Sequence, residues 1–139
     1  MNEHPQYRYC LAKCHDHLQL ALLGWMDLAN NKYGMLSTPS TNHKERAQFR
    51  REMEIARTNT IHNLEQAQIQ LDSVKHHWPQ NAITTTTMDV MEMARGLKDE
   101  QFFKTIGLAI CTSAITRLTF FSRTLCHKLK DSPPNNSVA

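Results

Sequence analysis

Residues 49–78, FRREMEIARTNTIHNLEQAQIQLDSVKHHW, have the most regular pattern in this chain. Apolar or small residues recur there at intervals of three or four positions over about eight helical turns. The set is Phe49, Met53, Ala56, Thr60, Leu64, Ala67, Leu71, Val74 and Trp78. This spacing places all of them on one face of an α-helix. The sequence therefore predicts a long amphipathic helix that packs along its whole length.

Both ends of this helix carry recognisable signals. Asn42, followed three residues later by Glu45, has the pattern of a capping box and predicts a helix that starts at residue 43. Pro79 cannot continue a helix and predicts an end at residue 78. At 1.5 Å per residue, residues 43–78 would span about 54 Å. A helix of that length implies an elongated bundle rather than a compact ball.

A second apolar stripe precedes this segment. It runs from Leu11 to Leu28 at helical spacing and predicts a first long helix. We expect that helix to fail near Asn30, and Gly34 to open a loop that ends near Pro39.

The C-terminal third predicts two further helices. A short helix is expected after the TTTT run, with Thr86 as its cap and Gly96 as its end, and Asp99 is expected to cap a last long helix. No strand-like alternation is present. The expected fold is all-α: an elongated antiparallel bundle of three long helices and one short, in up-down-up-down order. It forms a single domain over residues 1–130, and residues 131–139 are a tail that its composition predicts to be disordered.

The composition predicts a folded domain with a thin core. At 139 residues the chain is the size of one domain, and Leu, Ile, Val and Phe make up 29 of them. That fraction lies just above the level of roughly 20% below which chains tend to stay unfolded, while a net charge of +3 is too small to cause unfolding by repulsion. Thin cores gain stability from a partner, a second copy or a bound ion.

Several functional classes are not indicated. The polar start, MNEHPQYRY, does not resemble a secretory signal, and Gln19 and Arg117 interrupt the apolar runs well before the ~20 residues of a membrane span. Positive charge is spread evenly, so nucleic-acid binding is not indicated. We expect a cytoplasmic protein whose four cysteines are thiols or ligands rather than disulfides.

The segment CLAKCHDH, residues 10–17, predicts a metal site. Cys10, Cys14 and His17 share one helix face. In an up-down-up-down bundle, the start of the first helix would meet the ends of the second and fourth and the start of the third. The ligands gathered there would be Cys10, Cys14, Cys126, His127 and His76, with His15, His17, His77, Met88 and Met91 nearby.

Thiolates and imidazoles suit tetrahedral zinc, and added thioethers would favour Cu(I). The predicted cluster of ligands depends on a turn at Gly96, because one unbroken helix over residues 84–130 would place Cys126 at the opposite end of the bundle. The alternative interpretation is that Cys14 is a small core residue and that the histidines are solvated helix ends.

Two short segments resemble enzyme motifs. His15-Asp16-His17-Leu18-Gln19 resembles the phosphotransfer helix of histidine kinases, which implies His15 as phosphoacceptor and Asp16 as its acid/base partner. Arg57-Thr-Asn-Thr-Ile-His62 resembles the R-x4-H motif of HEPN ribonucleases, which have all-α domains. That resemblance implies that Arg57 stabilises phosphate and that His62 acts as the base.

Two other features bear on binding. The segment KERAQFRRE, residues 44–52, interleaves both charges and favours a solvated, salt-bridged face over a phosphate-binding one. The phenylalanines Phe102, Phe103, Phe120 and Phe121 come in pairs, so one ring of each pair points inward and the next lies roughly 100° around the helix. These four residues are candidates for a partner-binding surface, or for a core helix packed on two sides.

The sequence as a whole favours a non-enzymatic helical bundle that acts through a protein partner or by self-association, as a homo-oligomer. The alternative is a bundle that binds zinc or copper at one end, and zinc is then the expected cofactor. A further alternative is a phosphotransfer module or a HEPN-like ribonuclease.

Overall fold

The computed structural model describes residues 5–74 and 80–131, with side chains for residues 6–74 and 89–130. Its helices are α1 (Pro5–Ser37), α2 (His43–Val74), α3 (Gln80–Lys98), α4 (Glu100–Lys104) and α5 (Leu108–Asp131). No strand occurs in these two ranges. The three long helices α1, α2 and α5 pack antiparallel to their neighbours, so the all-α prediction is confirmed.

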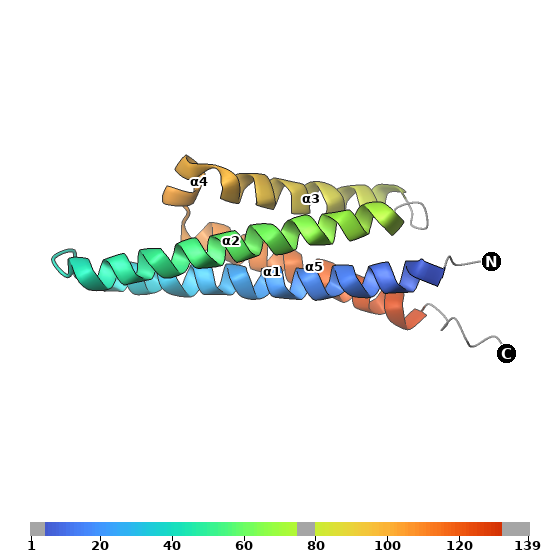
Figure 1. Ribbon diagram of the computed structural model, residues 1–139, viewed down its shortest axis with the longest axis horizontal. Coiled ribbons are helices and arrows are strands. Elements are labelled where there is room, and N and C mark those ends of the chain that lie inside the picture. The colour runs from blue at the N-terminus through green and yellow to red at the C-terminus, as the bar shows by residue number, and fades with distance from the viewer. Residues whose placement is uncertain (1–4, 75–79, 132–139) are drawn as a thin grey trace.

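The helices alternate in direction along one axis (Figure 1). The closest backbone packing joins α1 to α2 and to α5, and α2 to α3. Helix α1 therefore packs on both α2 and α5. Helix α3 packs on α2, and Asp89 of α3 pairs with Arg117 of α5 at 3.3 Å. The short α4 forms the corner at which the chain turns from α3 into α5 (Figure 1). This is the predicted up-down-up-down order.

The core is one continuous cluster of apolar side chains along the bundle. The stripe predicted on α2 is buried from Met53 to Val74, and Phe49 is half-buried; Trp78 lies outside the described residues. The largest fully buried side chains elsewhere are Leu11, Leu18, Trp25 and Leu28 of α1, Val90 and Leu97 of α3, Ile106, and Leu118 and Leu125 of α5. Each helix longer than one turn thus contributes a buried face.

Helices α1 and α2 approach most closely at Gly24 and Thr60. A Cβ atom added at Gly24 would lie 1.9 Å from Thr60 Oγ1 and 3.0 Å from Thr60 Cβ. Thr60 is fully buried, and its hydroxyl donates to the carbonyl of Ala56 at 2.6 Å. Only glycine leaves room for this crossing, so the spacing of the two longest helices depends on it.

We expect Gly24→Ala to destabilise the fold by about 2 kcal/mol in chemical denaturation, because overpacking outweighs the gain in helix propensity of about 1 kcal/mol. Thr60→Ala should reduce that cost in the double variant, because the closest atom is gone. Gly107→Ala is the control, since a Cβ atom there meets nothing within 4 Å. Equal effects of the two glycine substitutions would contradict this interpretation.

Helix α1 is longer than predicted and passes through Gly34 to end at Ser37. The reason is a tertiary contact: a Cβ atom at Gly34 would lie 2.5 Å from the ring of Phe49, so this ring packs directly on the backbone of α1. Thr38 then ends the helix, because its hydroxyl donates to the Gly34 carbonyl at 2.8 Å and its own carbonyl accepts from Arg46 at 3.2 Å. The prediction of an end near Asn30 was wrong.

The predicted start of α2 at residue 43 and its cap at Asn42 are confirmed, although the Asn42 backbone N–H donates to the Pro39 carbonyl at 2.9 Å and not to Glu45. The Glu45 backbone N–H donates to Asn42 Oδ1 at 3.1 Å, and Asn42 Nδ2 donates back to Glu45 Oε2 at 2.9 Å. The predicted end of this helix at residue 78 lies outside the described residues, as does the predicted tail beyond residue 131.

The last two predicted helices are placed differently in the structure. Helix α3 begins at Gln80 rather than at Thr86 and continues past Gly96 to Lys98, because Leu97 extends its buried face. Asp99 caps the next helix as predicted, accepting from the Phe102 N–H at 2.9 Å, but that helix is only α4.

The single last helix predicted from Asp99 to residue 130 is therefore two helices. The Thr105 N–H bonds back to the carbonyls of Gln101 and Phe102 and closes α4, and Ile106 is fully buried in the connection to α5.

None of the described helices combines the length and the apolar character that crossing a bilayer requires.

Candidate functional site

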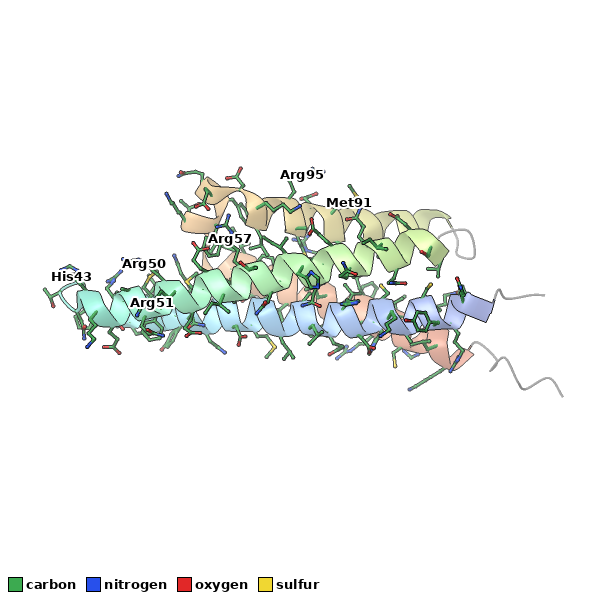
Figure 2. All side chains as sticks on the ribbon, in the orientation of Figure 1. His43, Arg50, Arg51, Arg57, Met91 and Arg95 are labelled. Atoms are coloured by element: carbon green, nitrogen blue, oxygen red, sulfur yellow. The ribbon has the colours of Figure 1, made fainter. Side chains whose placement is uncertain are left out.

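Arg57 of α2 organises the corner between α3 and α4. Its Nε donates to the Leu97 carbonyl at 2.6 Å and its Nη2 to the Lys98 carbonyl at 3.1 Å. These are terminal carbonyls of α3, which have no partner within that helix. Figure 2 shows Arg57 between α2 and this corner, whereas Arg50 and Arg51 lie nearer the α1–α2 loop.

The same guanidinium also binds the start of α4. Arg57 Nη1 lies 2.7 Å from Glu100 Oε1 and 3.3 Å from Glu54 Oε1, and the guanidinium lies 4.5 Å above the ring of Phe103. Burial lowers the pKa of Arg57, but the hydrogen bonds to Glu100 and Glu54 outweigh it and raise the pKa overall. Its donors are engaged by protein oxygens, and His62 is exposed. Arg57 is thus a structural residue of this corner.

This ion pair makes stability depend on pH. The hydrogen bond and charge of Arg57 lower the pKa of Glu100 below its ordinary value. Such a contribution to stability is fully present above the ordinary carboxyl pKa of about 4.3. It is lost as the pH falls from there through the lower pKa that Glu100 has in the folded state.

We therefore expect the melting temperature of wild type to exceed that of Glu100→Gln at pH 7, and the difference to shrink toward pH 3. Thermal melts followed by circular dichroism measure it. The control is Glu52→Gln, an exposed glutamate of α2 whose hydrogen bond comes from the uncharged Gln48 at 3.1 Å. A pH-independent difference for Glu100→Gln would contradict the assignment.

Four of the predicted metal ligands, Cys10, Cys14, Cys126 and His127, lie on α1 and α5 toward the end of the bundle where Arg8 of α1 donates to the Leu129 carbonyl of α5. Cys10 and Cys14 are buried, Cys126 is half-buried and His127 is exposed. Among the side chains that the structure describes, in residues 6–74 and 89–130, no three of His, Cys, Asp or Glu gather closely enough to hold an ion. His76 and His77 lie outside those residues, so the zinc site stays a prediction.

His15 and His17 of the CLAKCHDH segment lie on α1, and His17 contacts α2. His17 Nδ1 lies 2.9 Å from Asn63 Oδ1 of α2, which makes it part of the α1–α2 contact. His15 is half-buried and Asp16 is exposed. Gln19, the third residue of the phosphotransfer resemblance, donates to the Ser122 hydroxyl of α5.

The cysteines differ in environment, and this predicts their reactivity. Cys14 is fully buried, and burial, with the nearby Cys10, raises its pKa to about 12. Burial also raises the pKa of Cys111. Because the thiolate is the reactive form, we expect iodoacetamide to modify Cys126 well before Cys14 and Cys111 in the native protein, and all of them alike in denaturant.

Peptide mass spectrometry of timed samples measures this order. Repeating the reaction with a chelator tests the zinc prediction at the same time, because removing a bound ion would accelerate modification of Cys10, Cys14 and Cys126 together. Rapid native modification of Cys14 without chelator would contradict its place in the core.

The phenylalanine pairs divide as predicted, with one ring inward in each. Phe103 and Phe121 are buried, Phe102 is half-buried and Phe120 is 64% exposed. Phe103 packs under Arg57, as described above. Of the four candidate partner-binding residues, Phe120 is therefore the one whose ring is mostly open to a partner.

The most concentrated exposed apolar surface is on α1. Leu20, Leu23 and Met26 are 50%, 54% and 43% exposed and follow one another at intervals of three, so they are neighbours on the helix surface. We call these three residues the α1 ridge. The sequence analysis did not separate these residues from the Leu11–Leu28 stripe, because a leucine pattern does not show which face lacks a covering helix.

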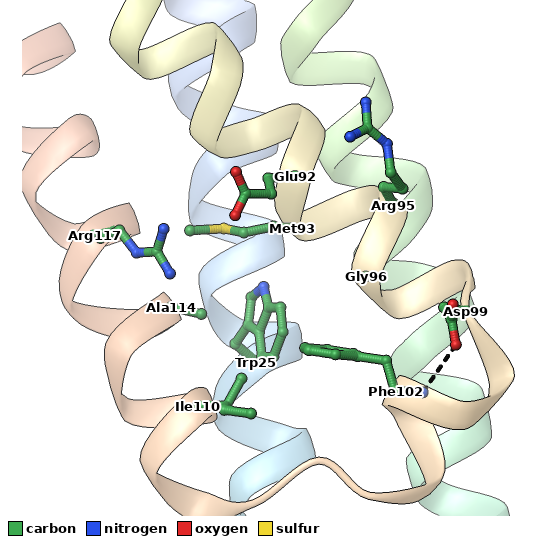
Figure 3. Close-up of a pocket in the computed structure, with 10 residues that line it drawn as sticks. All are labelled: Trp25, Glu92, Met93, Arg95, Gly96, Asp99, Phe102, Ile110, Ala114 and Arg117. Atoms are coloured by element: carbon green, nitrogen blue, oxygen red, sulfur yellow. Dashed lines mark hydrogen bonds between the residues drawn. The ribbon is translucent and has the colours of Figure 1, made fainter.

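A cavity of about 420 Å³ lies among α1, α3, α4 and α5, and the sequence did not predict it. Trp25 of α1 forms part of its wall, together with Met93, Phe102 and Ile110 (Figure 3). Asp89 and Arg117, 3.3 Å apart, bridge α3 and α5 beside it. Residues from four helices form this cavity, so no local sequence signal could have found it.

No protein-family model, curated protein or solved structure matches this chain. The class of protein that the fold defines is a small all-helical bundle, and the functional proposals depend on its own geometry.

Proposed function

We propose that this protein acts by self-association, and that two copies pack through the α1 ridge. The observation that carries the proposal is the exposure of Leu20, Leu23 and Met26, about half of each side chain, on a helix whose other faces already pack on α2 and α5. Adjacent apolar side chains of this kind mark interaction surfaces, whereas isolated ones are ordinary. A second copy would remove all three from water.

The charges around the ridge favour a symmetric pairing. In an antiparallel pair with a two-fold axis at Leu23, residue i of one copy faces residue 46 − i of the other. Leu20 then faces Met26, and Leu23 faces its own copy. The interface is thus apolar at its centre.

The same register brings no like charges together. Asp16 faces Asn30, Asp27 faces Gln19 and Lys13 faces Tyr33. A register shifted to place Leu20 opposite Leu23 would instead set Asp16 against Asp27, which costs energy through repulsion. The pattern therefore supports one register over its neighbour.

The thin core supports the same proposal. Large side chains that remain exposed on one copy add buried apolar area in a dimer, at about 25 cal/mol for each Å² removed from water. Stability and association would then be linked, and the melting temperature would rise with protein concentration.

Sedimentation equilibrium tests the proposal. We expect wild type to be a dimer at micromolar concentration and Leu23→Glu to be a monomer, since the two introduced carboxylates would meet at the axis. The matched control is Ile69→Glu on α2, which is equally exposed at 54% and lies outside the ridge, and which should remain dimeric.

Three results would contradict this proposal: a monomeric wild type, a dimer that survives Leu23→Glu, or dissociation caused by Phe120→Glu instead. The last would place the interface on α5, where Phe120 is exposed.

A further inference from the structure

Three basic side chains from three helices line one pocket beside the Arg57 corner. The pocket lies among α1, α2 and α4 and has a volume of about 200 Å³. Its basic residues are Lys32 of α1, Arg50 of α2 and Lys104 of α4. Arg50 precedes Arg57 by two helical turns, so both lie on one side of α2 (Figure 2). Arg50 and Lys104 are exposed and Lys32 is half-buried, so a solute can reach all three.

The buried Arg57 takes the two glutamates that would otherwise neutralise this pocket. Glu54 is the acidic residue of the lining and lies four positions after Arg50, yet its Oε1 lies 3.3 Å from Arg57 Nη1. Glu100 Oε1 lies 2.7 Å from the same nitrogen, and Arg57 lowers the pKa of Glu100 more than Lys104 does. Within the described side chains, the three basic residues of the pocket form no ion pair and no side-chain hydrogen bond.

Uncompensated like charges around one pocket favour an anion. Cations that line a pocket repel one another, and an anion placed among them replaces this repulsion by attraction. The lining carries three positive charges and one negative charge, which leaves a net charge of +2. A doubly charged anion would match it.

The size of the pocket limits this anion to a compact one. Sites for drug-sized ligands have volumes of about 300 Å³ or more. This pocket, at about 200 Å³, is smaller, and the half-buried Met35 forms part of its apolar lining. Arginine binds phosphate through its planar fork of donors, and lysine binds it as a point charge. A phosphate group, alone or with one small apolar substituent, therefore fits the charge, the donors and the volume.

We propose that this pocket binds a phosphate dianion, which accepts hydrogen bonds from Lys32, Arg50 and Lys104. The phosphate is either the free ion or the head of a small monoester whose apolar group contacts Met35. The site is separate from the α1 ridge and does not depend on self-association.

Isothermal titration calorimetry at low ionic strength tests the proposal, at about pH 8, where a phosphate monoester carries two negative charges. The probes are inorganic phosphate, phenyl phosphate and benzenesulfonate, which has the same ring and a single charge. We expect phenyl phosphate to bind with a Kd of about 1 mM or tighter, and benzenesulfonate about fivefold more weakly. Inorganic phosphate should bind as tightly as phenyl phosphate if the ligand is the free ion, and more weakly if it is an ester.

Substitutions in the pocket test the location of the site. Lys32→Gln and Lys104→Gln should each weaken the binding of phenyl phosphate about threefold to fivefold, and the double variant should abolish measurable binding. The matched control is Lys44→Gln, an exposed lysine of α2 outside the pocket, which should bind as wild type does. Melts followed by circular dichroism check that each variant is folded.

Lack of binding of both phosphates at about 10 mM would overturn the proposal. Equal losses from Lys44→Gln and Lys104→Gln would also overturn it, because the anion would then respond to the general positive charge of this region. So would benzenesulfonate binding as tightly as phenyl phosphate, because the ring and not the charge would then select the ligand.

Discussion

The arrangement of the bundle depends on the contacts that the buried Arg57 guanidinium makes in the α3–α4 corner. One side chain of α2 binds the last carbonyls of α3, pairs with the first glutamate of α4 and covers the ring of Phe103. A buried charge without partners is strongly unfavourable. Loss of one of these contacts would therefore leave the Arg57 charge less well compensated and destabilise the corner. By fixing the corner, Arg57 makes residues 84–130 two antiparallel arms instead of one rod. The cavity beside Trp25 exists because of that turn.

The parts of the fold that the sequence predicted are those with local signals. The stripe of α2 as far as Val74, the Asn42 cap and the Asp99 cap each depend on residues within a few positions of one another, and these are confirmed. The end of α1 was misplaced because the Phe49 ring, fifteen residues from Gly34 in sequence, packs on the α1 backbone. The start of α3 was misplaced because threonine lowers helix propensity only slightly, and a weak preference of that kind does not fix a boundary.

The candidate sites divide in the same way. The inward and outward rings of the phenylalanine pairs follow from helix geometry, and the structure shows them so. The R-x4-H resemblance implied that Arg57 stabilises phosphate, although its place beside Ala56 and near Thr60 in the apolar stripe was a visible signal of burial. The Trp25 cavity had no such signal, because its walls come from four helices. The exposure of the α1 ridge could not be predicted either, because it depends on which face of α1 the helices α2 and α5 leave uncovered.

The packing of α5 on α1 also bears on the order in which the chain folds. Arg8 contacts Leu129 and Gln19 contacts Ser122, pairs separated by 121 and 103 residues, whereas the α1–α2 hairpin closes over a short loop. Contacts between residues so distant along the chain form only after a large loss of chain entropy, so helical hairpins of low contact order assemble earlier. The N-terminal hairpin would then be the nucleus, and α5 would dock last. In such a sequence of events, substitutions on the α1-facing side of α5 accelerate unfolding and leave the rate of folding nearly unchanged.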